Sequence, residues 1–269
     1  MSSIYIFLFS FIECIILSSG FYLYLNKKTG ISLKYLLVDN ILVIVLSTSL
    51  TFFLIIFVRL IYIYFFNIII ILFISFIFFI IRFYRTPIRK INAEYNDIIS
   101  PSDGNIIYIK KLTAGKMPVS IKGKSLAKLN ELTKTDILKI PCWLIGINMT
   151  IFDVHKNCAP ISGEVILNQH FNGKFISLKL ADSEIENERH TIVIQKGDLM
   201  VGVVLIASRL VRRIDTYIKE GEHVQMGDWI GMIRFGSQVD ILIPQYYNLT
   251  INVKDQVYAR ETIIARLES

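Results

Sequence analysis

The sequence contains few cysteines, and their number excludes two kinds of cysteine-based framework. Cys14, Cys142 and Cys158 are the only three in 269 residues. An odd number without close pairs gives neither a set of disulfides nor a zinc-binding spacing. We therefore predict no metal, and we expect the functional part of the chain to lie in a reducing compartment.

Other patterns are also missing. The N-terminus has no positively charged start followed by a small-residue cleavage site, so the apolar segments should stay in the mature chain. No basic run is interleaved with aromatic residues as in a nucleic-acid-binding module, and we predict no nucleic-acid partner. The formal net charge of +7 instead suits a domain beside an anionic membrane surface.

Long apolar runs fill the first third of the chain. Residues 4–25 and 36–81 consist almost entirely of Ile, Leu, Phe, Val and Tyr. A single helix over the second run would be about 69 Å long, against a hydrocarbon core of roughly 30 Å. We therefore predict a hairpin of two spans, 36–57 and 61–81, with its turn near Arg59.

Charged residues indicate how the apolar segments are arranged in the membrane. Glu13 has no polar residue close to it in sequence and would be costly near the middle of a bilayer. Residues 4–25 therefore form either a third span, which we favour, or an interfacial helix. Basic residues flank the hairpin on both sides, and such flanks stay cytoplasmic. We predict the cytoplasmic membrane as the location, with the following domain on its cytoplasmic side. The flanking residues are Lys27, Lys28 and Lys34 before the hairpin, and Arg82, Arg85, Arg89 and Lys90 after it.

The chain after the transmembrane region 1–82 has the composition of a globular domain, 83–269. Short apolar alternations separated by turn residues are typical of a small β-barrel or sandwich. The turns in 219–224 and 226–230 resemble those of biotinyl/lipoyl-type folds, although no lysine occupies a carrier position. The expected fold is a membrane-anchored all-β protein. Strands are predicted over 106–109, 143–147, 164–167, 174–180, 191–194, 199–207, 229–235, 239–243 and 262–267.

A Gly-Ser step joins two of these predicted strands. Gly236 and Ser237 lie between 229–235 and 239–243, where glycine adopts turn geometries at little cost and leaves its carbonyl open to attack. A serine hydroxyl held against that carbonyl could split the chain. Most Gly-Ser pairs are plain turns, so this pair alone does not decide between the two interpretations.

Four motifs in order carry a family resemblance. They are Ser100-Pro101-Ser102-Asp103-Gly104; Asp153-Val154-His155 with Ala159-Pro160 and Gly163; Asn187-Glu188-Arg189; and Arg234-Phe235-Gly236-Ser237-Gln238-Val239-Asp240. With a membrane segment in front, they make the chain from Phe83 onward resemble phosphatidylserine decarboxylase, in particular its smaller form.

The resemblance implies a proenzyme that cuts itself between Gly236 and Ser237. The chain would divide into a larger fragment, 1–236, and a smaller fragment, 237–269, whose first residue becomes a pyruvoyl group. Decarboxylation of an α-amino acid needs an electron sink that ordinary side chains lack, and the sequence shows no clear pyridoxal-phosphate pattern. The pyruvoyl group would condense with the amine of phosphatidylserine and allow its conversion to phosphatidylethanolamine.

Two further residues complete the site that the resemblance implies. Ser237 needs a base at neutral pH, and His155 is the best candidate because histidine titrates in this range. Asp103 is the carboxylate expected to orient or assist that base, as in serine–histidine–carboxylate sites. Taken without the resemblance, Asp103 is typical of a turn aspartate before glycine.

Several basic residues have two interpretations. Arg212, Arg213 and Arg234 are candidate ligands of the substrate phosphate, for which a guanidinium is well shaped. Arg212 and Arg213 also suit an exposed strand edge. Residues 122–136 are typical of a solvated loop or of a flap that touches lipid headgroups.

One position departs from the family pattern. Larger members carry a second histidine three residues after the first, and this chain has Cys158 there, where smaller members commonly have arginine. His155 therefore serves both self-cleavage and decarboxylation, or His190 assists. Cys158 itself is either a reactive thiol or, more commonly, a small buried residue.

Two alternatives stay open at this point. In the first, the chain is a non-enzymatic membrane-anchored adaptor, and the Gly-Ser pair is only a turn. In the second, the chain cleaves itself but decarboxylates a different amino-bearing substrate. The sequence does not decide the oligomeric state, and a homo-oligomer stays open.

Overall fold

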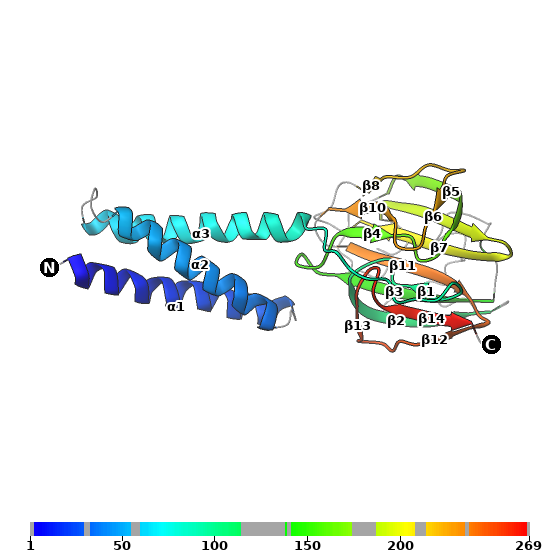
Figure 1. The fold of residues 1–269 in the computed structure, drawn as a ribbon, viewed down its shortest axis with the longest axis horizontal. Helices are drawn as coiled ribbons and strands as arrows, with labels where there is room; N and C mark the ends of the chain where they lie inside the picture. Colours follow the sequence, from blue (N-terminus) through cyan, green and yellow to red (C-terminus); the bar gives the residue numbers. More distant parts are fainter. Residues whose placement is uncertain are drawn as a thin grey trace. The chain divides into compact units, whose positions relative to one another are not determined.

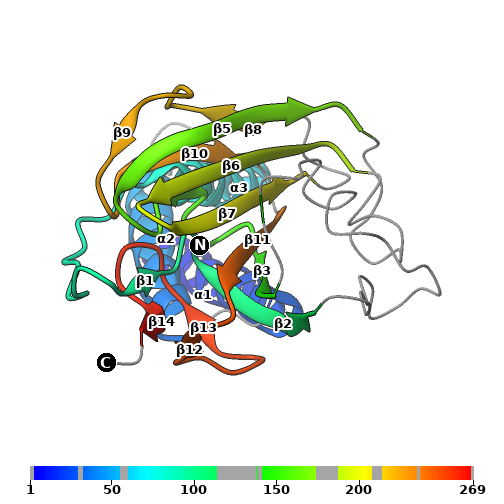
Figure 2. The ribbon, with the colours of Figure 1, turned by 90° about the vertical axis from the view of Figure 1, so that its right-hand side faces the viewer.

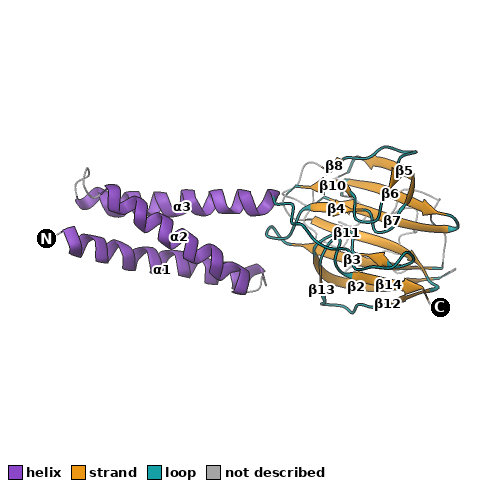
Figure 3. Ribbon diagram, in the orientation of Figure 1, coloured by secondary structure: helices purple, strands orange, loops and turns teal. Residues whose placement is uncertain are grey.

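A computed structural model describes residues 3–29, 33–54, 60–113, 138, 141–173, 187–207, 214–234 and 237–267. The chain divides into two compact units, Met1–Tyr84 and Arg85–Ser269. The first unit is helical, and the second is built from strands (Figures 1 and 3).

Three long helices form the first unit: α1 (Ser3–Thr29), α2 (Leu33–Leu54) and α3 (Leu60–Tyr84). Each contains a stretch that is long and apolar enough to cross a membrane. The predicted turn at Arg59 lies outside the described residues. The three stretches, which overlap the predicted spans, are Phe7–Lys27, Leu36–Phe53 and Phe65–Tyr84.

Polar contacts join the helices. The Arg82 guanidinium in α3 donates two hydrogen bonds to the Asp39 carboxylate in α2, at 2.7 and 2.8 Å. Glu13 in α1 accepts a hydrogen bond at 3.3 Å from the Asn67 amide in α3. The packing of α1 and α3 thus gives Glu13 a polar partner that its sequence neighbours do not supply.

The described residues of the second unit form antiparallel strands in three sheets, one of eight strands and two of three strands. The described strands are β1 (Ile98–Ile99), β2 (Gly104–Leu112), β3 (Cys142–Met149), β4 (Lys156–Cys158), β5 (Gly163–Phe171), β6 (Arg189–Lys196), β7 (Leu199–Ile206), β8 (Ile214–Thr216), β9 (His223–Val224), β10 (Trp229–Ile233), β11 (Ser237–Pro244), β12 (Tyr247–Leu249), β13 (Gln256–Val257) and β14 (Ile263–Leu267).

The large sheet has the strand order β13-β2-β3-β11-β7-β6-β5-β9 and curls into a half barrel (Figure 2). The small sheets have the orders β1-β14-β12 and β4-β10-β8. The fold is therefore mostly β-sheet after three apolar helices, as the sequence predicted. The strand β11, which starts at Ser237, lies in the centre of the large sheet between β3 and β7.

Side-chain alternation along the central strands separates two faces of the large sheet. Val239, Ile241 and Ile243 of β11 belong to the main core, which also takes side chains from β1, β10 and β14. The main core is therefore enclosed between the large sheet and the two small ones. Asp240 and Leu242 are buried on the other face of β11.

The predicted strands coincide with β2, β3, β5, β6, β7, β10, β11 and β14, and most of them are longer in the structure. The predicted strand 174–180 lies outside the described residues. The prediction missed β1, β4, β8, β9, β12 and β13, because runs of two or three residues show no alternation. Ser237, which was expected in a turn, is already the first residue of β11.

The large sheet consists of two equivalent halves. The strands β13-β2-β3-β11 and β9-β5-β6-β7 follow the same order from edge to centre, and each half has its own three-stranded sheet. Backbone hydrogen bonds are exchanged symmetrically between the halves. Ile99 N donates to Pro160 O at 3.1 Å, and Cys158 N donates to Pro101 O at 2.8 Å. The chain therefore contains a two-fold internal repeat that the sequence analysis did not detect.

The loops that lead into β9 and β10 have counterparts in the loops that lead into β13 and β14. Gly221 and Gly227 have φ angles of 84° and 88°, and the corresponding Lys254 and Arg260 have φ angles of 81° and 69°. Glycine adopts this left-handed region freely, whereas lysine and arginine are strained there. The loops before β13 and β14 follow the same backbone path as the loops before β9 and β10 but contain different residues. The repeat is therefore not visible in the sequence.

Candidate active site

His155 directly precedes β4 and is fully buried. Its Nδ1 lies 2.8 Å from the carbonyl oxygen of Asp153. A carbonyl only accepts hydrogen bonds, so Nδ1 carries the proton and Nε2 holds the lone pair. Burial lowers the pKa of His155 to about 4. At neutral pH the imidazole is therefore uncharged and can accept a proton at Nε2.

Asp103, in the loop before β2, is almost fully buried and accepts four hydrogen bonds. Arg89 donates two of them, at 2.5 and 2.8 Å. The backbone nitrogens of Ala259 and Val154 donate the others, at 2.8 and 3.3 Å. Because Val154 precedes His155, Asp103 holds the backbone that carries the imidazole. Burial dominates the lowered pKa of His155, and the negative charge of Asp103 acts in the opposite direction.

The internal repeat separates the structural role of Asp103 from its chemical role. Its counterpart is Ser162, whose Oγ accepts a hydrogen bond from Met226 N at 2.8 Å, as Asp103 accepts one from Ala259 N. A hydroxyl is thus sufficient for this backbone contact. This bond joins residues far apart in the sequence and is not a local turn contact. The carboxylate adds the pairing with Arg89, the bond from Val154 N and a negative charge near the imidazole.

Strand pairing connects the start of β11 to His155. Ser237 pairs with Met149 of β3, and Ile233, the last residue of β10, donates its backbone N–H to the His155 carbonyl at 3.2 Å. The chain passes from β10 to β11 through Gly236, which lies outside the described residues. The structure thus brings His155 and Asp103 together near the end of the sheet where β11 begins.

A buried polar cluster follows Ser237 along β11, and the sequence analysis missed it. Asp240 accepts hydrogen bonds from the Tyr108 hydroxyl and from Gln238 Nε2, both at 2.7 Å. Gln238 Nε2 also donates to the Tyr108 hydroxyl at 2.8 Å. Burial raises the pKa of Asp240 to about 6. The cluster links the beginning of β11 to β2, across the strand β3 that lies between them. Polar residues at alternate positions of an otherwise apolar strand were the available signal.

The candidate phosphate-binding arginines have different outcomes. Arg234 forms an ion pair with Asp215 of β8, with N–O distances of 2.9 and 2.8 Å, and its side chain is 40% exposed. Arg212 and Arg213 lie outside the described residues, as do residues 122–136. A role of Arg234 toward phosphate stays a prediction, and its guanidinium already has a carboxylate partner.

Cys158 and His190 are both buried. Cys158 Sγ donates to the Ser100 carbonyl at 3.3 Å, and burial raises the thiol pKa to about 12. A thiol with this pKa stays protonated, which favours the structural interpretation of Cys158. His190 Nε2 lies 2.6 Å from Asn168 Oδ1, and burial lowers the pKa of His190 to about 4. His190 belongs to β6, which β7 separates from β11.

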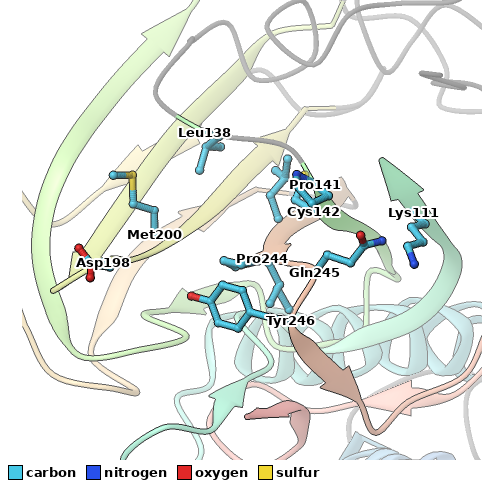
Figure 4. A pocket seen from close by; sticks show the side chains of 11 residues that line it. Lys111, Leu138, Pro141, Cys142, Asp198, Met200, Pro244, Gln245 and Tyr246 are labelled. Atoms are coloured by element: carbon cyan, nitrogen blue, oxygen red, sulfur yellow. The ribbon is translucent and has the colours of Figure 1, made fainter. Parts of the chain in front are cut away.

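A pocket of about 630 Å³ lies at the opposite end of β11 (Figure 4). Its lining includes Cys142, Leu242 and Tyr246. Pro244 ends β11 at this pocket, whereas Ser237 begins the strand. At about 3.3 Å per residue, roughly 23 Å separate the two ends. The pocket therefore does not belong to the candidate active site.

The fold and the site define a class of protein. It has a β-sheet domain with a buried neutral histidine and a buried carboxylate near the strand that follows a Gly-Ser step, and three apolar helices precede this domain. A family model described as phosphatidylserine decarboxylase matches residues 76–265. The chain belongs to this family, as its four motifs indicated.

Similar proteins include proenzymes with two substrate names. The chain is 41% identical over 191 residues to the putative archaetidylserine decarboxylase proenzyme of Methanocaldococcus jannaschii, which covers 71% of this chain and 91% of the relative. A protein of the same name from Methanothermobacter thermautotrophicus is 37% identical over 190 residues, with coverages of 70% and 80%. The phosphatidylserine decarboxylase proenzyme of Ralstonia pickettii is 33% identical over 191 residues, with coverages of 71% and 79%.

Proposed function

We propose that this protein is a membrane-associated decarboxylase of a serine-headgroup phospholipid, made as a proenzyme and activated by self-cleavage between Gly236 and Ser237. The observation that carries the proposal is the buried, neutral His155, held together with Asp103 near the strand that begins at Ser237. Membership of a family of carboxy-lyases made as proenzymes supports both the reaction and the maturation.

In the proposed self-cleavage, Ser237 Oγ attacks the Gly236 carbonyl carbon while His155 Nε2 takes the hydroxyl proton. An ester C–O bond forms, and the peptide C–N bond breaks as the nitrogen of residue 237 takes up a proton. Elimination then removes the Cα proton of residue 237 and breaks the Oγ–Cβ bond, which frees the Gly236 carboxylate and leaves dehydroalanine at position 237. Water converts this residue to a pyruvoyl group and ammonia. Burial lowers the pKa of His155 to about 4, so the imidazole does not titrate near neutral pH as its residue type predicted; it is uncharged there and would take the proton as a weak base.

The residues near the start of β11 fit a carbonyl prosthetic group that receives an amine. His155 offers a proton acceptor at Nε2, and Asn157 offers a buried carboxamide oxygen that has no hydrogen-bond partner in the part of the chain that the structure describes. Once formed, the pyruvoyl group supplies the electron sink for decarboxylation.

The sheet topology supports a stable association of the two fragments. The smaller fragment, 237–269, contributes β11, β12, β13 and β14. Among these strands, β11 lies between β3 and β7, β13 pairs with β2, and β14 pairs with β1. All of the partner strands belong to the larger fragment, so cutting the chain before Ser237 leaves these pairings in place.

The proposed substrate is phosphatidylserine, and the product is phosphatidylethanolamine. Two of the similar relatives are named for archaetidylserine, so a lipid of that kind is the second candidate. The three apolar helices support a membrane location, and the basic flanks favour the cytoplasmic side. Phosphate binding by Arg212, Arg213 and Arg234, and the likeness to biotinyl/lipoyl-type folds, belong to the same proposal.

Denaturing electrophoresis of protein made in cells tests the maturation. The wild-type chain of 31.0 kDa should yield a fragment of about 4 kDa, Ser237→Ala should remain full-length, and His155→Ala should mature more slowly. Mass spectrometry of the smaller fragment should find a pyruvoyl group in place of the serine. An active wild-type protein with residue 237 intact would overturn the proposal, and an inactive intact one would favour the adaptor.

A separate assay identifies the substrate. Mature protein is given labelled phosphatidylserine or labelled archaetidylserine, and the lipid that loses carbon dioxide is the substrate.

A further inference from the structure

The side chain of Asn157 is buried without an adequate polar partner. The residue lies in the middle of β4 and has no exposed surface. Among the described residues its Oδ1 has no hydrogen-bond partner, and its Nδ2 donates to the sulfur of Met149 at 3.9 Å. A thioether is a weak acceptor, and a buried amide left in this state destabilises a fold. The asparagine therefore needs an explanation other than packing.

The internal repeat shows that the fold does not require a polar residue at this position. The counterpart of Asn157 is Ile98 in β1: Asn157 pairs with Gly231 of β10, and Ile98 pairs with Ala265 of β14, in each case beside the same irregularity in register. Ile98 is also fully buried and belongs to the main core. The same backbone environment thus accepts an aliphatic side chain in the other half.

Other polar residues depart from the repeat near the start of β11, on the face of the large sheet opposite to the main core. The cluster of Tyr108, Gln238 and Asp240 occupies positions that are apolar or glycine in the other half. Polar residues that the local fold does not require tend to mark functional sites. By strand register, the matched pairs are Tyr108 and Leu167, Gln238 and Met200, and Asp240 and Gly202.

Asn157 lies close to the proposed cleavage point. Met149, which contacts the Asn157 carboxamide, is directly opposite Ser237 in the β3–β11 pair. Residues directly opposite each other in an antiparallel pair have Cα atoms about 4.5–5.5 Å apart. Asn157 also follows His155 by two positions. The unpaired oxygen is therefore within reach of the region where the substrate would react.

We propose that Asn157 Oδ1 accepts a hydrogen bond from the amino group of the substrate's serine headgroup, an inference that rests on the function proposed above. The headgroup has three polar groups, a phosphate, a carboxylate and an amino group. The phosphate and the carboxylate only accept hydrogen bonds when ionised, and a carboxamide oxygen also only accepts. The amino group is the one that donates, so Asn157 directs the amine toward residue 237.

Two variants test this contact. Asn157→Ile introduces the residue of the other half, and Asn157→Val is smaller and closer to asparagine in size. Both should mature fully on a denaturing gel. Because the unpaired buried amide is gone, Tm should rise by about 2–6 °C. In the same variants kcat/KM for labelled phosphatidylserine should fall about 10- to 100-fold, because the amine loses its acceptor. The control Ile98→Asn introduces an unpaired amide into the other half and should lower Tm.

Each other outcome overturns the inference. A lower Tm in both Asn157 variants would show that the amide stabilises the fold. An unchanged kcat/KM would show that it does not touch the substrate. Variants that keep an intact Ser237, while wild-type protein matures, would assign the amide to self-cleavage instead. Failure of the proposed function itself is distinguishable, because the wild-type protein would then show no pyruvoyl fragment or no decarboxylation.

Discussion

At the scale of single residues, the site depends on ionisable groups whose pKa values are changed by burial. Burial lowers the pKa of His155 and His190 from 6.5 to about 4. Between these values the unfolded chain binds protons that the folded protein does not, so these histidines reduce stability as the pH falls from 6.5 to 4. Asp240 acts in the opposite sense. Burial raises the pKa of Asp240 from 3.8 to about 6. Its stabilising contribution to the free energy of unfolding is therefore present at low pH and is lost as the pH rises through 6.

Replacement of a buried histidine should reduce this acid sensitivity. His190→Gln keeps a side chain able to bond to Asn168 but cannot take up a proton. The free energy of unfolding should fall less between pH 6.5 and 4 than in the wild-type protein, by at most about 3 kcal/mol. Urea unfolding at several pH values measures the difference. The exposed His223→Gln serves as control, and equal pH slopes for all three proteins would contradict the prediction.

The two halves of the repeat also allow the charge of Asp103 to be removed while its contact with Ala259 N is kept. Asp103→Ser introduces the residue found at Ser162, and Arg89→Met in the same chain avoids leaving a buried cation unpaired. The double variant should fold but mature at least about 10-fold more slowly, because the positive charge that forms on His155 loses a nearby carboxylate. Electrophoresis at intervals after synthesis follows the conversion. Ser162→Ala, which loses the contact with Met226 N and the exposed bond to Gln225 but no charge, should mature normally; equal rates for the double variant and wild type would remove the electrostatic role.

At the scale of secondary-structure elements, the repeat offers pairs of loops with the same backbone and different residues. Lys254, in the loop before β13, is exposed and has a φ of 81°, and its counterpart Gly221, before β9, has a φ of 84°. No heavy atom lies within 4 Å of a Cβ added at Gly221. Substitution at Gly221 therefore reports on backbone conformation alone.

Exchange of the residue types at these loops should have opposite effects on stability. Lys254→Gly relieves the left-handed strain and should stabilise the protein by about 0.5 kcal/mol after the larger entropy of the unfolded glycine is counted. Gly221→Ala introduces the strain and should destabilise by about 1 kcal/mol. Urea unfolding at neutral pH measures both. Effects of the same sign would show that the loops are not equivalent.

At the scale of the whole molecule, the apolar helices belong to the larger fragment, whereas the smaller fragment is bound within the sheets. The helices should hold the larger fragment in the membrane, and strand pairing should hold the smaller fragment, which has no apolar helix of its own among the described residues. The location of the smaller fragment should therefore depend on the fold of the sheet.

Fractionation of membranes that contain matured protein tests this arrangement. After a high-salt wash both fragments should remain in the pellet, since neither the helices nor β11 depend on surface charge. Concentrated urea should then release the 237–269 fragment and leave the larger one in the membrane. Release of the smaller fragment by salt alone would show that strand pairing does not retain it. Uncleaved Ser237→Ala should remain in the pellet throughout.

Much of the fold was predictable from the sequence, and the motifs supplied the candidate residues for the site. The helices and the longer strands were identified because apolar periodicity extends over many residues. Asp103, His155 and Ser237 were singled out by motifs, and the structure places the first two near the start of β11. The very short strands were missed because they have too few residues to show a period.

The sequence by itself determined the apolar helices, the alternation of the long strands and the family motifs, because each of these depends on residues that are neighbours in the chain. Only the tertiary structure decided that the sheet is a two-fold repeat, that Asn67 reaches Glu13, and that Asn157 is buried beside Met149 with its oxygen unpaired. Burial and hydrogen bonding depend on partners that are distant in sequence, and these partners come together only when the strands and helices pack.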